Sequence, residues 1–185
     1  MARHKLRFLH VALILCVVAI LSLTLGKTWV TIGGLWKTGA HERRSLDLIP
    51  FLDFFTATTW FAPTFNLVGN IAMFVPFGIL LAFSGWFRKF RRNVVALVAA
   101  VAFAFSFSLE SIQFLLKIGY TDTGDLISNT LGAALGARSA VEMMRKASRL
   151  ACQLMVYACC LFAATVFFLL DLVPALLEIL PKWLQ

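Results

Sequence analysis

Five long stretches of the chain contain few charged side chains, and this feature limits the possible folds more than any other. An α-helix needs about 20 mostly apolar residues to cross the hydrocarbon core of a bilayer. Hydrophobic residues make up 61% of the sequence, well above the roughly half that is usual in a soluble domain. We therefore predict one all-α, polytopic membrane domain over residues 1–185, with about five transmembrane helices at residues 8–25, 65–87, 94–116, 125–141 and 150–173.

The first apolar run begins after Arg3, Lys5 and Arg7, a basic start that a secretory signal peptide would also have. Its apolar part is longer than the roughly 7 to 15 residues of a signal peptide, and no Ala-x-Ala-like cleavage site follows it. We therefore expect an uncleaved first helix.

Basic residues predict the orientation of the bundle, because short cytoplasmic loops are enriched in Lys and Arg. Eleven of the 17 basic residues fall at the start of the first run, between the second and third runs, and around the end of the fourth. This pattern predicts a cytoplasmic N terminus and an external C terminus. A basic cytoplasmic rim suits anionic headgroups, so membrane lipids are the expected partners, and the sequence contains no nucleic-acid-binding module.

Polar side chains recur on one face of three predicted helices. With a rise of 1.5 Å per residue, Glu110, Asn129 and Asn70 each lie roughly 10 Å below the outer surface. A carboxylate that faced lipid tails would cost several kcal/mol, so these faces must point into the bundle or into a water-filled cavity. We call this predicted feature the polar seam, and its members are Asn66, Asn70, Ser106, Glu110, Gln113, Lys117, Asp122, Asp125 and Asn129.

Four sequence elements occur in a characteristic order: DLIPF at 47–51, NLVGNIAMFVPFG at 66–78, ESIQ at 110–113 and DTGDLISNTLGAALG at 122–136. Together they resemble the VanZ-like membrane proteins, a family named for a protein associated with teicoplanin resistance in Gram-positive bacteria. The resemblance covers residues 46–136. Asp47 stands where the family commonly has Asn, and the Arg often found before the Asp pair is absent, with Lys117 the nearest basic residue. The resemblance implies a multi-pass protein of the bacterial cytoplasmic membrane that acts in the cell envelope, and it implies no particular reaction.

Glu110 is the strongest candidate for chemistry, because an ionisable side chain inside a membrane helix is a functional hypothesis by default. Its expected partner is Lys117 or Asn129. If the protein is an enzyme, which the sequence leaves open, Glu110 and Asp125 are the expected acid and base. The expected substrate-binding residues are Asn66, Asn70, Gln113, Lys117, Asp122 and Asn129, together with Arg43 and Arg44 of the external segment.

The polar residues also have structural alternatives. Asp122 can cap the free N–H groups at the start of a helix, and Asp125 suits the positive end of the helix dipole. Asn70 and Asn129 can serve as hydrogen bonds between helices. At the level of sequence both alternatives stay open.

Other motifs favour packing and anchoring. Gly132 and Gly136 form a Gly-x-x-x-Gly pair, which predicts a close helix crossing either within the chain or between protomers of a homo-oligomer. The Cys and His residues show no metal-ligand spacing, so we predict no metal site, and the cofactor is unknown. The external segment 26–64 is rich in Trp and Phe, which favours an interfacial or re-entrant element that covers the polar seam or only anchors the chain.

Two classes of function fit these features. In the first, a polar site at the outer leaflet binds a lipid-linked envelope precursor or an amphiphilic antibiotic. In the second, the protein is a non-catalytic structural or accessory membrane protein whose polar seam serves helix packing. A transporter is a third class, but the sequence shows no inverted-repeat pattern.

Overall fold

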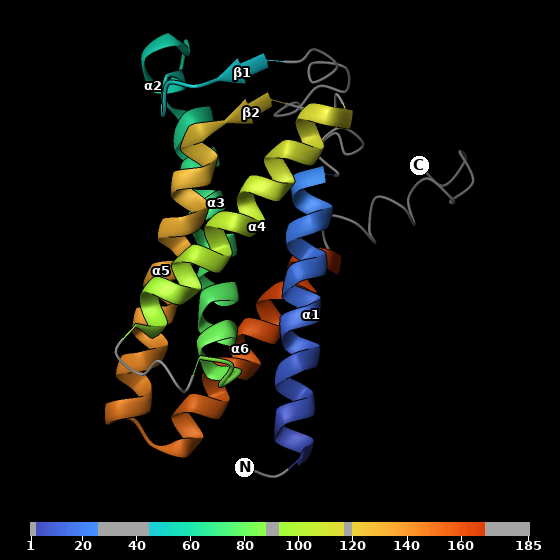
Figure 1. The fold of residues 1–185 in the computed structure, drawn as a ribbon, viewed down its shortest axis with the longest axis vertical. Helices are drawn as coiled ribbons and strands as arrows, with labels where there is room; N and C mark the ends of the chain where they lie inside the picture. Colours follow the sequence, from blue (N-terminus) through green and yellow to red (C-terminus); the bar gives the residue numbers. More distant parts are fainter. Residues whose placement is uncertain (1–2, 26–44, 88–92, 117–119, 169–185) are drawn as a thin grey trace, which may run out of the picture.

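Five long helices form a bundle, and a small cap of two strands and one short helix lies at one end of it (Figure 1). The structure is a computed structural model that describes residues 3–25, 45–87, 93–116 and 120–168. The described elements are α1 (Arg3–Leu25), β1 (Ser45–Asp47), α2 (Asp53–Thr56), α3 (Phe61–Phe83), α4 (Val94–Leu116), β2 (Tyr120–Asp122), α5 (Thr123–Lys146) and α6 (Arg149–Phe167). This arrangement confirms the predicted all-α helical bundle.

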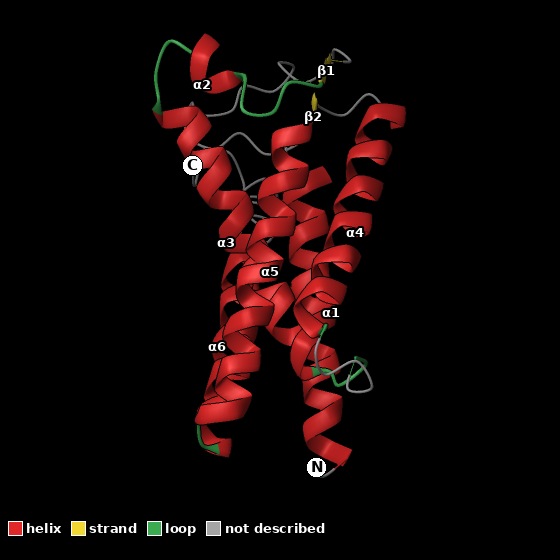
Figure 2. Ribbon diagram, turned by 60° about the vertical axis from the view of Figure 1, so that its left-hand side comes forward, coloured by secondary structure: helices red, strands yellow, loops and turns green. Residues whose placement is uncertain are grey.

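Four helices are long and apolar enough to cross a membrane, with spans at Arg7–Leu25, Phe61–Phe83, Val94–Leu116 and Arg149–Val166. The fifth long helix, α5, has 24 residues and is about 36 Å long, but it is less apolar. It runs beside α3 and α4 along the bundle (Figures 1 and 2). The five predicted helices therefore correspond to four apolar spans and one helix with a buried face of small and polar residues.

The ends of α3 differ from the predicted range of 65–87, because an apolar run does not show where a helix is capped. The helix begins at Phe61, and Pro63 in its first turn loses nothing there, since the first N–H groups of a helix have no partner within it. It ends at Phe83, where the Ser84 hydroxyl donates to the Leu81 carbonyl oxygen at 2.7 Å. Gly85 then adopts a positive φ of 79°, which glycine allows at little steric cost.

The observed ends of other helices also differ from the predicted ones. Basic residues in the last turn suit the negative end of a helix dipole, and α5 continues to Arg145 and Lys146 instead of stopping at Val141. The predicted fifth helix reached residue 173, and the part after residue 168 lies outside the described residues.

Helices α3 and α5 cross at very short range because glycines face backbone on both sides. A Cβ added to Gly78 would overlap the Ala133 backbone of α5, and one added to Gly136 would overlap the Val75 backbone of α3. A Cβ added to Gly132 would also overlap the backbone of Ile71. The contact made by the Gly-x-x-x-Gly pair is therefore internal to the chain. A homo-oligomer through Gly132 and Gly136 stays a prediction, and it would require α3 to leave this position.

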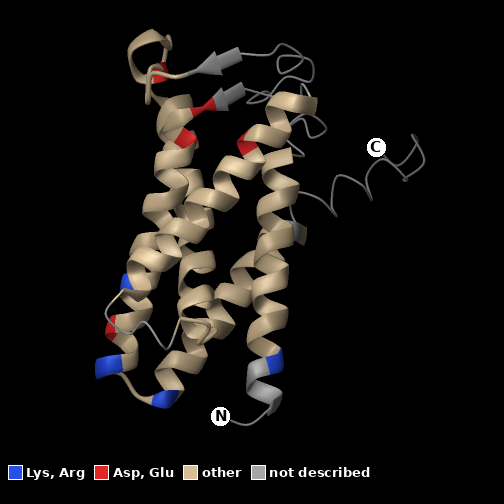
Figure 3. Ribbon diagram, in the orientation of Figure 1, with Lys and Arg blue, Asp and Glu red and all other residues tan. Residues whose placement is uncertain are grey.

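Charged side chains are divided between the two ends of the bundle (Figure 3). The end that carries β1, β2 and α2, which we call the cap end, has the acidic residues Asp53, Glu110, Asp122 and Asp125. The opposite end, which we call the basic end, has Arg7, Arg138, Arg145, Lys146 and Arg149, with Glu142 beside Arg138. Among the described side chains, the separation of charge matches the one predicted from the sequence.

Candidate functional site

At the cap end, two asparagines hold one carboxylate in place. Asn66 Nδ2 and Asn70 Nδ2 both donate to Asp125 Oδ1, at 2.7 and 2.6 Å. The asparagines lie one turn apart on the same face of α3, and Asp125 lies in the first turn of α5. Hydrogen bonds to an ionised carboxylate are roughly twice as strong as neutral ones, so this contact fixes both the helix pair and the direction of the carboxylate.

The start of α5 is fixed by a cap and by a strand pair. Asp122 is the N-cap residue, and its Oδ1 accepts a hydrogen bond from the Gly124 N–H at 2.7 Å. This confirms the helix-capping role that was one of the two alternatives for Asp122. The strand β1 pairs in parallel with β2, and Asp47 lies opposite Asp122 in the register. The pairing joins the loop between α1 and α3 to the loop between α4 and α5.

Phe51 adopts an unusual backbone conformation beside the start of α5. Its φ of 61° lies in the left-handed region, which bulky residues seldom enter. Its backbone nitrogen would be 3.2 Å from a Cβ added to Gly124, and so would an atom of its own ring. A side chain at position 124 would therefore be tightly packed, and the Phe51 loop or the Asp122 side chain would have to shift by a few tenths of an ångström. Strained backbone of this kind concentrates at binding and catalytic sites.

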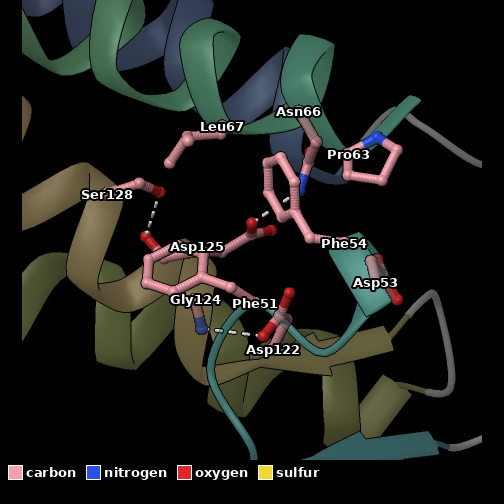
Figure 4. A pocket seen from close by; sticks show the side chains of 10 residues that line it. All are labelled: Phe51, Asp53, Phe54, Pro63, Asn66, Leu67, Asp122, Gly124, Asp125 and Ser128. Carbon is pink, nitrogen blue, oxygen red and sulfur yellow. Dashed lines mark hydrogen bonds between the residues drawn. The ribbon is translucent and has the colours of Figure 1, made fainter. Parts of the chain in front are cut away.

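A small pocket of about 10 Å³ lies at this position and opens to the surface of the bundle. We call it the Asp125 pocket, and Figure 4 shows the Asp125 carboxylate among the lining side chains, with Asn66 reaching it from α3. One wall contains the rings of Phe51 and Phe54, whose centroids are 6.5 Å apart. The lining residues are Phe51, Asp53, Phe54, Pro63, Asn66, Leu67, Asp122, Gly124, Asp125 and Ser128.

Deeper in the bundle, two further amides join helices. Asn129 Nδ2 donates to the Ser106 Oγ of α4 at 2.9 Å, and Gln113 Nε2 donates to the Thr24 carbonyl oxygen of α1 at 2.8 Å. Both amide side chains are buried. These contacts bridge neighbouring helices, which is the packing role that sequence reasoning left open for Asn129.

Glu110 is buried on the inner face of α4, and it reaches the start of α5. Its Oε2 accepts a hydrogen bond from the Asp122 backbone N–H at 3.3 Å. The predicted partners were Lys117 and Asn129. Lys117 lies outside the described residues, and the Asn129 amide donates to Ser106 instead.

The structure therefore divides the predicted polar seam into two groups. Asn66, Asp122 and Asp125 line the Asp125 pocket, and Asn70 donates to Asp125. Ser106, Gln113 and Asn129 lie deeper, and Glu110 contacts the start of α5. Arg43 and Arg44 lie outside the described residues, as does Lys117. Of the external segment, Phe51, Asp53 and Phe54 line the pocket, which agrees with the expectation that this segment covers polar residues.

Sequence reasoning missed several residues of the pocket. Asp53 and Phe54 were assigned only to the external segment, and Pro63, Leu67 and Ser128 were not singled out. The DLIPF element that contains Phe51 was the one available signal, since it belongs to the family resemblance. The sequence could not identify the Thr24 carbonyl as the partner of Gln113, because every residue has a backbone carbonyl.

No group of three or more His, Cys, Asp or Glu side chains lies close enough to hold a metal ion in the part of the chain that the structure describes. The Asp125 pocket instead combines carboxylates, the Asn66 amide and aromatic rings. Such a lining can accept hydrogen bonds from a polar group while the rings contact its apolar part.

Comparison with known proteins identifies the family. The VanZ/LLP1 family model matches residues 11–144. The chain is also similar to Protein VanZ of Enterococcus faecium, with 36% identity over 102 residues, which are 53% of this chain and 53% of that protein. The chain thus spans about half the length of the curated relative it matches, and no solved structure matches it. Because the family model covers most of the sequence, the chain belongs to the VanZ/LLP1 family.

Proposed function

We propose that this VanZ/LLP1 family membrane protein binds the polar end of an amphiphile in the Asp125 pocket, at the outer leaflet of the bacterial cytoplasmic membrane. The amphiphile is a lipid-linked envelope precursor or an amphiphilic antibiotic. The binding serves a cell-envelope function or resistance to teicoplanin-type glycopeptides. The name of the similar Enterococcus faecium protein, Protein VanZ, and the family match support this context.

The observation that carries the proposal is the orientation of Asp125. Two amides from another helix hold its carboxylate in a pocket that opens at the cap end. One hydrogen bond between an amide and the carboxylate would be enough to join α3 and α5, because these helices already pack closely through glycines. An oriented carboxylate beside two aromatic rings is better suited to a ligand than to packing alone.

The lining also limits the chemistry of the ligand. Three carboxylates, those of Asp53, Asp122 and Asp125, face or border the pocket, and no Lys or Arg occurs among its described lining residues. This composition favours a group that donates hydrogen bonds, such as an amine or a sugar hydroxyl, next to an apolar portion that contacts Phe51 and Phe54.

The charges of the bundle support the position at the outer leaflet. Basic residues favour the cytoplasmic side of a membrane protein, and the described Arg and Lys side chains lie at the basic end. The Asp125 pocket lies at the other end, which is then the outer one. Exposed apolar residues of the cap, including Leu48, Ile49, Phe55 and Trp60, suit the headgroup region there.

A structural or accessory role is the second candidate, and a separate observation favours it. The buried Ser106–Asn129 and the partly buried Gln113–Thr24 hydrogen bonds join helices, and none of these residues lines the pocket. In this alternative, the pocket residues also serve only to hold α3 and α5 together.

The Asp125→Asn variant separates the two candidates. It removes the charge and keeps an acceptor oxygen for Asn66 and Asn70, so the fold should persist while ligand binding weakens at least tenfold, about 1.4 kcal/mol. The measurements are protein level in the membrane, teicoplanin susceptibility of a susceptible Gram-positive host that expresses the protein, and binding of teicoplanin and of a lipid-linked peptidoglycan precursor to protein in bilayers.

Glu142→Gln is the matched control, because Glu142 is an exposed acid at the basic end. It should behave as wild type in every measurement. If Asp125→Asn is as abundant as wild type and both susceptibility and binding are unchanged, the proposed function is wrong. If the variant disappears from the membrane, the packing role is favoured.

A further inference from the structure

Two buried amide oxygens have no hydrogen-bond donor among the described residues. They are Gln113 Oε1 and Asn129 Oδ1, on side chains that are only 4% and 5% exposed. In both side chains the NH₂ group already donates, to Thr24 and Ser106 respectively. Each amide is therefore held by its nitrogen, and its oxygen is buried without a described partner.

Turning the Gln113 amide over does not solve the problem. A flipped Gln113 would place its oxygen against the Thr24 carbonyl oxygen, so that two acceptors would meet. A flipped Asn129 could accept from the Ser106 hydroxyl, and its NH₂ group would then occupy the buried position and need an acceptor there. Each amide thus has a buried polar group that needs a partner, and buried polar groups in proteins are almost always satisfied.

Both oxygens lie along the inner face of α4 that carries Glu110. By helical rise, Gln113 is about 5 Å and Glu110 about 9 Å from the cap-end terminus of α4. Asn129 is about 9 Å from the start of α5, and it contacts α4 one turn deeper than Glu110, at Ser106. The order from the cap end inward is therefore Gln113, Glu110, Asn129.

We propose that water binds at Gln113 Oε1 and at Asn129 Oδ1, and that these sites form a hydrated path between α1, α4 and α5. Each oxygen needs one donor, and a buried water typically satisfies about three otherwise unpaired polar groups. The path runs from the cap end past Glu110, and gives its carboxyl group a route for exchanging protons with the solution on that side. The inference is independent of the Asp125 pocket and its ligand.

Water is favoured over a metal ion because the ligands that a cation needs are not gathered there. A hard cation takes six or more oxygen ligands around one point. The two unpaired oxygens lie on different helices, and the described residues contain no cluster of three acidic, His or Cys side chains. One water molecule at each oxygen would supply the missing hydrogen-bond donor.

Solid-state NMR of the full chain in lipid bilayers tests the path directly. Magnetisation is transferred from water protons to the isotope-labelled carboxamides of Gln113 and Asn129, with the fully buried Ala102 of α4 and Ala133 of α5 as dry references. We expect transfer to both carboxamides to be at least three times faster than to either alanine. Transfer to one or both carboxamides at the alanine rate would overturn the proposal.

The variant Gln113→Met tests whether the two sites belong to one path. It removes the outer water site and keeps the volume, so transfer to Asn129 should slow at least twofold. Unchanged transfer to Asn129, in a variant whose other resonances match wild type, would overturn the proposal. If Gln113→Met does not fold, Gln113→Leu and the wild-type measurement decide the outcome.

Discussion

At the scale of single residues, the structure moves attention from Glu110 to Asp125. Sequence reasoning favoured Glu110, because a carboxylate deep in an apolar helix is hard to explain otherwise. In the structure Glu110 accepts a backbone hydrogen bond from Asp122, which ties α4 to the start of α5. Asp125 lines the pocket and is held by Asn66 and Asn70, so it is the carboxylate to test for ligand binding.

Phe51 allows a prediction about backbone strain. With φ at 61°, a residue that carries a Cβ costs about 1 to 2 kcal/mol relative to glycine. Phe51→Gly and Phe51→Ala both remove the ring, but only the glycine relieves the strain. We expect Phe51→Gly to be more stable than Phe51→Ala by about 1 kcal/mol, as measured by equilibrium unfolding in mixed micelles. Equal stability of the two variants would show that the loop is unstrained.

At the scale of elements, the crossing of α3 and α5 decides where the pocket residues meet. The glycines let the two backbones touch, so side chains one or two turns further toward the cap end come within hydrogen-bond distance. The same helix face that carries Gly132 and Gly136 therefore also brings Asp125 to the asparagines.

Substitution of two glycines tests this close packing. A Cβ at Gly136 would overlap the backbone of α3, whereas a Cβ at Gly69 would meet nothing within 4 Å. Gly136→Ala should destabilise the protein by about 1 to 3 kcal/mol, the usual effect of overpacking. Gly69→Ala should be neutral or stabilising by up to about 1 kcal/mol, because alanine is the better helix former. The two variants are compared by equilibrium unfolding, and a similar effect of both would contradict the packing.

At the scale of the whole molecule, the division of charge predicts the orientation in the membrane. Thr58 is exposed between α2 and α3 at the cap end, and Lys146 is exposed in the last turn of α5 at the basic end. In a background without native cysteines, Thr58→Cys should react with a membrane-impermeant thiol reagent added to intact cells. Lys146→Cys should react only after the membrane is permeabilised. The reverse pattern would place the Asp125 pocket on the cytoplasmic side.

The features that the sequence predicted correctly are those that depend on composition or on residues close together in the chain. Membrane location, the approximate helix ranges, the cap at Asp122 and the separation of acidic from basic residues all follow from composition and near-neighbour spacing. Resemblance to a known family added the envelope context. The helix ends were less accurate, because caps such as Ser84 depend on single hydrogen bonds that an apolar run does not reveal.

The sequence by itself therefore determined that this protein is an apolar helical bundle with polar faces on three helices. Only the tertiary structure decided which polar groups meet, since Asp125 is joined to asparagines 55 and 59 positions away and Gln113 to a backbone carbonyl 89 positions away. The physical reason is that a helical period fixes which residues share a face, whereas the partner of that face depends on how the helices cross. Here the glycine contact between α3 and α5 sets that crossing.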